Sequence, residues 1–352
     1  MRNFAREAEI VGEALRKDPE RTLFASEIET PVGVLTRIGG SRARPETPSV
    51  WQNKKTLFKT EIRETKTVVV HFTGEPYGED PDYFQRDFQD YYDFHQGRVI
   101  PGERKVAPDF YGSHSPTMTL LTEAAERDLS QYFRSQDKKA VAGTVKKAID
   151  LTDYAISQTR RNTPSFPRYL SAFLTPEYPF LAGKKIRNYL SDPELIALYK
   201  DTQRQTIAFI TPLTELGFVS GICLSDIKAE NLVKDREGRV FFIDPTRYGR
   251  MHRLAAIGQL FQNTADDAPE SLFAKILRQK VEELIVAERD PQTAVCHFLT
   301  GRMNRLALPL TLRNLSFNID SGGENDEQLV EEKLYALRRL LNRRSLEEAL
   351  VF

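Results

Sequence analysis

A change of hydrophobic pattern near residue 128 constrains the fold of this 352-residue chain more than any other feature. Before it, short β-branched and apolar runs are separated by turn residues, a pattern that predicts strands. After it, apolar residues recur at three- and four-residue spacing, which predicts helices packed on a core. The sequence therefore predicts an α+β protein in two parts, a strand-rich part over residues 1–123 and a helical part over residues 124–352.

The strand-rich part is expected to contain two hairpins and one main helix. The Thr30-Pro31-Val32 turn separates two runs that can pair, and residues 65–66 separate two more. The helix begins at Asp80-Pro81-Asp82, because proline is tolerated in a first helical turn and acidic side chains favour the positive helix N-terminus. Strands are predicted over residues 22–29, 33–38, 57–64, 67–72, 107–111 and 118–122.

The second part is predicted to be helical apart from one strand pair. The pair covers residues 232–234 and 240–243, with a turn at Asp235-Arg236-Glu237-Gly238. A small strand-rich part followed by a larger helical part is a bilobal plan, and ligands commonly bind between lobes. Helices are predicted over residues 128–133, 138–158, 193–216, 254–262, 269–288, 292–299 and 328–350.

The composition excludes several classes of protein. Fifty Lys and Arg side chains balance fifty Asp and Glu side chains, so no net charge draws the chain to nucleic acid. The longest apolar runs are much shorter than a membrane span requires. Two cysteines, Cys223 and Cys296, are too few for a disulfide framework or a four-cysteine zinc site.

The N-terminal segment bears on location. The first 21 residues are charged throughout and lack the apolar region of a secretory signal peptide. Together with the few cysteines, this favours a reducing, cytoplasmic environment. A protein exported to a host by a signal-independent route would have the same features, so the sequence leaves that alternative open.

Residues 223–244 carry the chemical information. They read Cys-Leu-Ser-Asp-Ile-Lys-Ala-Glu-Asn-Leu-Val-Lys-Asp-Arg-Glu-Gly-Arg-Val-Phe-Phe-Ile-Asp. Asn231 follows Asp226 by five positions, and Asp244 follows Asn231 by thirteen, with a strand, a glycine turn and a strand between them. The segment resembles the catalytic loop and metal-binding strand of the protein-kinase superfamily, whose signature is H-R-D-L-x-x-x-N followed by D-F-G. Lys228 stands where these proteins typically carry a lysine.

The resemblance implies a role for each of these side chains. In phosphoryl transfer the protein positions the donor and the acceptor and stabilises charge, with little covalent work of its own. Asn231 and Asp244 would bind Mg²⁺, for which amide and carboxylate oxygens are suitable ligands. Asp226 would orient the acceptor hydroxyl or take its proton, and Lys228 would place a cation near the transferred phosphoryl group.

A second stretch extends the resemblance toward the nucleotide base. Residues 118–129 are similar to the last N-lobe strand and the hinge of a kinase. This match implies that the backbone of Glu123, Ala124 and Ala125 faces the edge of an adenine ring. An ordinary strand-to-helix junction is the alternative interpretation.

No glycine-rich loop of kinase type is present. Gly39 and Gly40, followed by Ser41-Arg42-Ala43-Arg44, are the only glycine pair near the first strands. Two glycines and two arginines can hold phosphates through backbone amides and charge. An ordinary turn explains the pair equally well.

The phosphate-binding lysine of kinases has no direct counterpart. Aligning Val68-Val69-Val70 with the third kinase strand puts His71 in the lysine position. Lys59 then lies on the preceding strand, from which a lysine can still reach the phosphates. In this register the usual helix glutamate falls near Asp87. A lone histidine such as His71 is more often structural than a phosphate ligand.

The segment after Asp244 departs from the kinase pattern. Pro245-Thr246 replaces Phe-Gly, and the helical pattern returns by Leu254, so the activation segment is very short and contains no A-P-E. Protein kinases use this segment to dock peptides. Its shortness favours an atypical kinase, a small-molecule phosphotransferase or an enzyme that uses the fold for another transfer.

We therefore predict an atypical kinase that transfers the γ-phosphoryl group of ATP, with Mg²⁺, to a hydroxyl of a protein or small molecule. Asp226 and Lys228 would be catalytic, Asn231 and Asp244 would bind the metal, and Lys59 would neutralise phosphate charge. Two alternatives stay open. One is a pseudokinase that acts as a binding or scaffolding module, and the other is an enzyme that transfers a nucleotidyl group.

Overall fold

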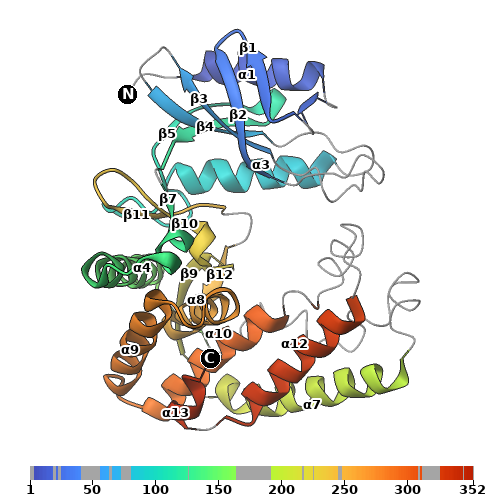
Figure 1. Cartoon of the computed structure of the whole chain (residues 1–352), viewed down its shortest axis with the longest axis vertical. Coiled ribbons are helices and arrows are strands. Elements are labelled where there is room, and N and C mark those ends of the chain that lie inside the picture. Colours follow the sequence, from blue (N-terminus) through green and yellow to red (C-terminus); the bar gives the residue numbers. More distant parts are fainter. Residues whose placement is uncertain are drawn as a thin grey trace. The chain divides into compact units, whose positions relative to one another are not determined.

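A computed structural model shows that the chain forms two compact units (Figure 1). Unit 1 comprises residues 1–126 with two later pieces, Asp235–Glu237 and Phe241–Thr246, and unit 2 comprises the rest. Asp226 and Asn231 therefore belong to unit 2, whereas Asp244 belongs to unit 1. The predicted lobe boundary at residue 123 stays a prediction. The structure describes residues 4–18, 21–22, 25–40, 56–62, 66–72, 81–125, 127–163, 192–215, 218–224, 226–244, 248–307, 310, 326–343 and 345–351.

Unit 1 is built on a six-stranded antiparallel sheet in the order β1-β2-β3-β4-β6-β5 (Figure 1). Both predicted hairpins form, and the first reverses at Pro31-Val32 before Gly33, whose φ of 139° favours glycine. The strands are β1 (Glu27–Thr30), β2 (Gly33–Gly40), β3 (Thr56–Ile62), β4 (Lys66–Phe72), β5 (Phe110–His114) and β6 (Thr119–Glu123).

Helix α1 (Ala5–Lys17) packs on the sheet of unit 1. Its buried side chains Ala8, Val11 and Leu15 have the spacing of an amphipathic helix and join the apolar core formed with the strands. The sequence alone does not predict this helix, because charged residues between those positions hide the apolar stripe. Unit 1 thus contains a second long helix besides the main helix that the sequence predicts.

The second helix of unit 1, α3 (Pro81–His95), packs on the other face of β4. Val68 and Val70 point into the core that contains α1, so His71 points the opposite way. There the His71 ring lies 5.5 Å from the ring of Tyr91 on α3. The helix begins at Pro81, as the sequence predicted.

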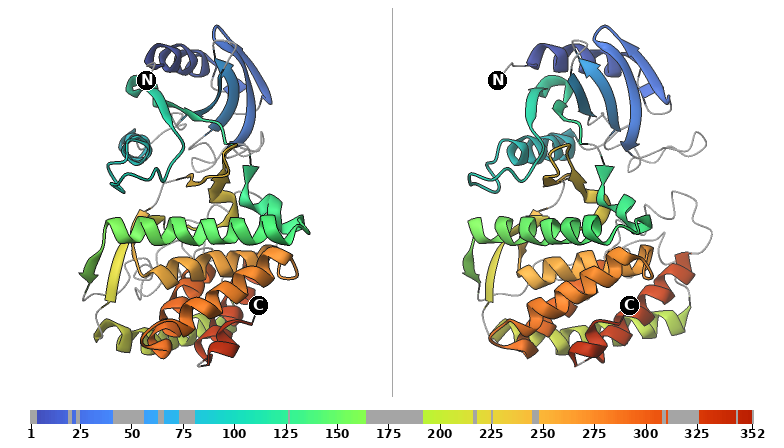
Figure 2. Two further views of the ribbon diagram at one scale, coloured as in Figure 1. Left: turned by 90° about the vertical axis from the view of Figure 1, so that its left-hand side faces the viewer. Right: turned by 60° about the vertical axis from the view of Figure 1, so that its left-hand side comes forward.

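Unit 2 is mainly helical. Figure 2 shows the long helix α4 lying alongside α8 and α9. Asp137 caps α4, because its carboxylate accepts hydrogen bonds from the N–H groups of Lys139 and Ala140, both at 3.0 Å. Within the described residues, no helix has the length and apolar character that a membrane span requires. The helices are α4 (Lys138–Gln158), α7 (Pro193–Glu215), α8 (Arg253–Asp267), α9 (Leu272–Val286), α10 (Pro291–Ala307), α12 (Asp326–Leu341) and α13 (Leu346–Ala349).

Short strands in unit 2 position the loop that contains Asp226. β9 (Phe218–Leu224) is the middle strand of a sheet in the order β12-β9-β8 and packs against α4. Gly221 allows this approach, because a Cβ atom there would overlap the carbonyl oxygen of Ile156. The remaining strands are β7 (Arg127–Asp128), β8 (Arg161–Thr163), β10 (Leu232–Lys234), β11 (Val240–Phe242), which continues into unit 1, and β12 (Tyr248–Met251).

Several predicted elements differ from the structure. Unit 2 contains β7, β8, β9 and β12 besides the predicted strand pair, and the strand predicted over residues 107–111 is β5 (Phe110–His114). Helices α8 and α10 extend beyond their predicted ends to Asp267 and Ala307. Residues 21–22 form a helical turn, so the first strand begins at Glu27. Residues 129–134 form a 3-10 helix, η2 (Leu129–Arg134). The single helix predicted over residues 328–350 is two helices, because a capping box at Ser345 starts α13: its hydroxyl and the Glu348 carboxylate each accept the other's backbone N–H at 3.2 Å.

Candidate functional site

The loop after β9 contains three of the predicted site residues. It ends in a single 3-10 turn, η3 (Ala229–Asn231), before β10 begins. The Asn231 side chain folds back on the loop, because its Nδ2 donates to the main-chain carbonyl of Asp226 at 2.9 Å. Asn231 is only 6% exposed, so its amide is fixed in orientation, and Oδ1 is the atom of that amide suited to accept a ligand.

The Asp226 carboxylate lies between two cations of unit 2. Its Oδ1 accepts a hydrogen bond from Nη1 of Arg305 at 2.9 Å, and its Oδ2 lies 3.4 Å from Nζ of Lys228. The Asp226 side chain is nevertheless 34% exposed. A carboxylate that is held in one orientation and still accessible has the two properties that a proton acceptor or an orienting group needs.

Arg305 is a site residue that the sequence alone does not predict. It stands near the end of α10, 79 positions from Asp226. Its Nη2 also donates to Oδ1 of Asn263 on α8 at 3.1 Å, so the guanidinium group is held at two points. No sequence motif links these positions, because only the packing of distant helices brings Arg305 to the loop.

Glu230 adds a second carboxyl group to the loop. Burial raises its pKa, and the charge of Asp267 raises it further, while Lys228 and Arg305 lower it. Burial thus makes the charged form of the Glu230 carboxyl group less favourable than it is in water.

Asp244 is held within unit 1 by its backbone and by a phenol. Its φ of 58° lies in the left-handed region, which only one other non-glycine residue adopts among those described. The Tyr91 hydroxyl of α3 donates to Oδ1 of Asp244. The strand before it is tied to unit 1, because the Phe242 N–H donates to the Val106 carbonyl at 2.8 Å. Such strained backbone costs on the order of 1–3 kcal/mol and tends to cluster at ligand sites, which supports a functional role for Asp244.

Lys59 lies on β3, the strand before β4, as predicted. Its cross-strand neighbour is Val69, so Lys59 shares the sheet face of His71. His71 Nε2 lies 2.9 Å from Oγ1 of Thr122, which favours the structural interpretation of this histidine. The side chain of Asp87 lies outside the described part of the chain. The contact of Lys59 with phosphate stays a prediction.

The segment matched to a hinge begins at the end of β6. The Glu123 N–H donates to the Asp109 carbonyl at 2.8 Å, and the predicted contact of the Glu123 backbone with adenine stays a prediction. Ala124 and Ala125 follow β6 outside any helix or strand and are partly exposed. The contact of Ala125 with adenine stays a prediction.

Gly39 and Gly40 belong to a strand and not to a turn. They end β2 opposite Leu57 and Thr56, after a register shift that begins at Arg37. The ordinary turn considered for this pair is therefore wrong at the glycines themselves. Residues 41–44 lie outside the described residues, and the phosphate-binding role of the segment stays a prediction.

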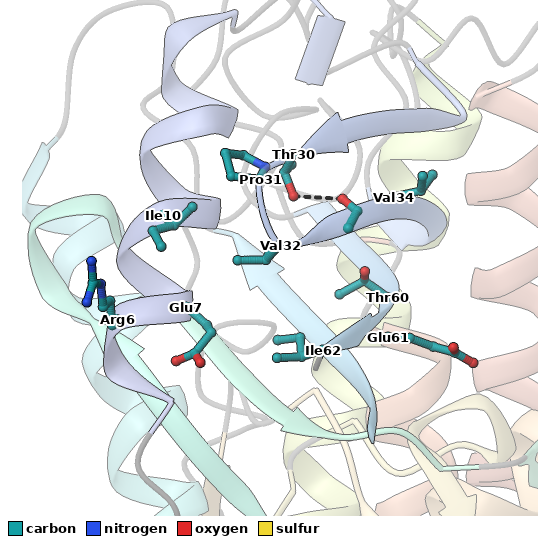
Figure 3. Close-up of a pocket in the computed structure, with 11 residues that line it drawn as sticks. Arg6, Glu7, Ile10, Thr30, Pro31, Val32, Val34, Thr60, Glu61 and Ile62 are labelled. Carbon is teal, nitrogen blue, oxygen red and sulfur yellow. Dashed lines mark hydrogen bonds between the residues drawn. The ribbon is translucent and has the colours of Figure 1, made fainter. Parts of the chain in front are cut away.

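A hollow of about 1100 Å³ lies in unit 1 (Figure 3). It is bordered by Arg6 and Ile10 of α1, by the β1–β2 turn and by the end of β3. The turn is stabilised by a hydrogen bond of 2.7 Å from the Thr30 hydroxyl to the Gly33 carbonyl (Figure 3). None of the predicted site residues lines this hollow.

The predicted metal ligands fit Mg²⁺ in kind. Among the described residues, no group of three or more His, Cys, Asp or Glu side chains is placed to hold a metal ion. Mg²⁺ does not require such a cage, because it is usually held by one or two carboxylates together with water and substrate phosphates. The oriented amide oxygen of Asn231 and the carboxylate of Asp244 are hard oxygen donors of this type.

Comparisons with known proteins point to one fold. No protein-family model matches the sequence, and no curated protein matches it. A choline/ethanolamine kinase family protein from Mesorhizobium loti superposes with a TM-score of 0.55 and 13% identity, over 95% of this chain and 98% of that one. The aminoglycoside phosphotransferase APH(4)-Ia gives 0.56 and 15%, over 92% and 97%. The chain has a protein-kinase-like fold.

A third structure with the same kinase-like fold is the choline kinase LicA from Streptococcus pneumoniae, with a TM-score of 0.51 and 12% identity over 94% of this chain and all of that one. At these identities the likeness concerns the fold alone. It confirms the α+β, kinase-like class that the spacing of Asp226, Asn231 and Asp244 indicated.

Proposed function

We propose that this kinase-like chain is an ATP- and Mg²⁺-dependent phosphotransferase that acts on a small-molecule hydroxyl. The observation that carries the proposal is the geometry of the loop from Asp226 to Asn231. There a carboxylate and an amide are each oriented by neighbours in unit 2, as positioning and charge stabilisation require.

A small acceptor is favoured over a protein by two observations. Helix α8 begins at Arg253, only nine positions after Asp244, which leaves little chain for a peptide-docking segment. The structural neighbours carry choline and aminoglycoside in their names, and APH(4)-Ia has been crystallised with ADP and hygromycin B.

Each predicted residue receives a role in this proposal. Asp226 orients the acceptor hydroxyl and takes its proton, while Lys228 brings positive charge to the side of Asp226 Oδ2. Asn231 and Asp244 hold Mg²⁺, which when bound neutralises negative charge on the phosphates. Lys59 adds a second positive charge toward the nucleotide.

The proposal is tested by measuring nucleotide binding and by following the label of γ-labelled ATP. We expect ATP to raise Tm in the presence of Mg²⁺, because a ligand that binds the folded state stabilises it. Asp244→Ala is expected to abolish the Mg²⁺-dependent part of that shift. Incubation with γ-labelled ATP is expected to transfer the label to water or to an added hydroxyl compound. Absence of any shift and of any transfer would rule the proposal out.

A pseudokinase is the second candidate, because His71 occupies the position of the kinase lysine and has a structural partner in Thr122. A scaffold without catalytic activity would bind nucleotide weakly or not at all and would transfer no label. Nucleotidyl transfer is distinguished from transfer of the γ-phosphoryl group by the position of the label, since it would move the label of α-labelled ATP onto the acceptor.

A further inference from the structure

Helices α8 and α10 cross at a point of very close backbone contact. A Cβ atom at Gly301 would overlap the carbonyl oxygen of Ala255, and one at Gly258 would overlap that of Phe298. Larger residues at these two positions would therefore push the helices apart. The two glycines fix the distance between the helices, and with it the positions of side chains that leave them nearby.

Three side chains from this helix pair reach the catalytic loop or each other. Gln259, beside Gly258, accepts the N–H of Ile227 through Oε1 at 3.3 Å. Arg305, one turn after Gly301, donates to Oδ1 of Asp226. Asn263 accepts from the same guanidinium group and is only 2% exposed, so it holds Arg305 from the buried side. The loop thus rests on one rigid pair of helices through both a backbone and a side-chain contact.

The two oxygens of Asp226 have different partners. Oδ1 makes a charge-assisted hydrogen bond with Arg305 at 2.9 Å, whereas Oδ2 has Lys228 at 3.4 Å, within ion-pair range. Lys228 is the cation assigned to the transferred phosphoryl group, so Oδ2 is the oxygen on the phosphate side.

We propose that Arg305 is a positioning residue that holds Asp226 by Oδ1 and so presents Oδ2 to the acceptor hydroxyl. This inference rests on the proposed phosphotransferase function. In the transfer, the acceptor oxygen forms a bond to the γ-phosphorus as the bond from that phosphorus to the oxygen of ADP breaks. ADP leaves with the electron pair, and Oδ2 receives the acceptor proton. In this proposal Arg305 acts on the reaction through its hydrogen bond to Asp226.

The test measures phosphate release from MgATP, with water as the acceptor, in the full chain. Arg305→Met is expected to lower kcat roughly 30- to 100-fold with an unchanged KM for MgATP, because misplacing a catalytic group by about 1 Å can cost that much. Arg305→Lys keeps the charge and most of the volume, and is expected to recover part of the loss. Added guanidinium ion at non-denaturing concentration is expected to raise the kcat of Arg305→Ala.

Arg253→Met is the matched control. Arg253 is 33% exposed, compared with 23% for Arg305, and it pairs with Glu288 at 2.6 Å and with Asp153 at 3.6 Å. Arg253→Met is expected to keep the wild-type kcat, and added guanidinium ion is expected not to change the kcat of this variant. A normal kcat in Arg305→Met, or an equal loss in Arg253→Met, would overturn the positioning role. A wild-type protein that transfers no label from γ-labelled ATP, either to water or to an added hydroxyl compound, would overturn the proposed function and this inference with it. An active wild type together with a normal kcat in Arg305→Met would overturn the inference alone.

Discussion

Asp226 in unit 2 and Asp244 in unit 1 are predicted to serve one reaction, yet they are held by different means. Asp226 is oriented by two charged side chains, Arg305 and Lys228. Asp244 is oriented by a left-handed backbone conformation and by the neutral phenol of Tyr91. The first carboxylate therefore depends on electrostatics and the second on backbone geometry.

The interiors of both units contain ionisable groups. The core of unit 1 between α1 and the sheet is apolar, but this unit also buries His71 and Asp235, which are 8% and 4% exposed. Unit 2 buries ionisable groups: Arg302 is 3% exposed, and the stacked rings of His252 and His297 lie 4.1 Å apart. Burial lowers the pKa of both histidines of unit 2, so the stability of unit 2 is expected to depend on pH.

The largest effect is expected at Asp226. Asp226→Asn keeps the size of the side chain but cannot take a proton, so kcat is expected to fall by roughly 10²- to 10⁴-fold. Binding of MgATP, measured as a rise in Tm, is expected to remain. The control Asp201→Asn removes an ion pair with Arg338 at 2.8 Å and should leave kcat unchanged. Full turnover in Asp226→Asn would remove this residue from the reaction.

The next effect concerns the charged interior of unit 2. Arg302 donates to Oε1 of Gln262 at 2.8 Å and to the carbonyls of Ala349 and Val351 at 2.6 and 3.2 Å, and thereby holds the C-terminal segment. Arg302→Met is expected to lower the free energy of unfolding by about 2–4 kcal/mol, measured in urea, since it leaves these acceptors unpaired. Arg338→Met is the control, because the Arg338 side chain is 43% exposed. Equal losses of unfolding free energy in Arg302→Met and Arg338→Met would contradict a special role for burial.

The histidine pair is expected to make unit 2 sensitive to acid. Burial lowers the pKa of His252 to about 2 and that of His297 to about 4, and His252 Nδ1 accepts the Leu254 N–H at 3.2 Å, which requires a ring without a proton on that nitrogen. The unfolded chain takes up these protons near its ordinary pKa of about 6.5, so stability falls as pH drops below that value.

The expected loss is about 1 kcal/mol for each histidine at pH 5.5 relative to pH 7.5, from urea unfolding at both values. His297→Gln should reduce this difference, whereas His114→Gln in unit 1 should not. If the free energy of unfolding differs by the same amount between pH 5.5 and pH 7.5 in both variants, groups other than His297 cause the pH dependence.

Backbone geometry at Asp244 predicts a smaller effect. Asp244→Ala and Asp244→Gly both remove the carboxylate, so both should lose the Mg²⁺-dependent rise in Tm with ATP. Glycine adopts a φ of 58° without steric cost, so Asp244→Gly is expected to be more stable than Asp244→Ala by about 1–2 kcal/mol. Equal free energies of unfolding would mean that the backbone stores no strain at this position.

The smallest effect is expected at the phenol. Tyr91→Phe removes the hydrogen bond to Asp244 and is expected to cost about 1 kcal/mol in unfolding free energy, with a weaker affinity for MgATP. Tyr92→Phe is the matched control, because it also removes a phenol hydroxyl from α3 but leaves the hydrogen bond of Tyr91 to Asp244 in place. The Tyr92 ring packs edge-on against the Phe110 ring, 5.6 Å away. Wild-type affinity in Tyr91→Phe would separate the phenol from the nucleotide site.

Elements encoded by short stretches of sequence could be predicted well. Helix α4 spans Lys138–Gln158 as expected, because its apolar spacing is continuous. The hairpin of β3 and β4 and the turn near Gly238, whose φ is 75°, also follow from neighbouring residues. The order of Asp226, Asn231 and Asp244 along a strand-turn-strand segment pointed to the kinase-like fold for the same reason.

Elements that depend on distant partners could not be predicted in this way. The apolar stripe of α1 becomes part of a core only because the sheet of unit 1 packs against it.

By itself, the sequence determined the two-part α+β plan and the residue types of the catalytic loop, because periodicity and spacing act over short distances along the chain. Only the tertiary structure decided which groups orient Asp226. Arg305 lies 79 positions away and reaches the loop because Gly258 and Gly301 let α8 and α10 pack in backbone contact, and that packing depends on side-chain volumes far apart in the sequence.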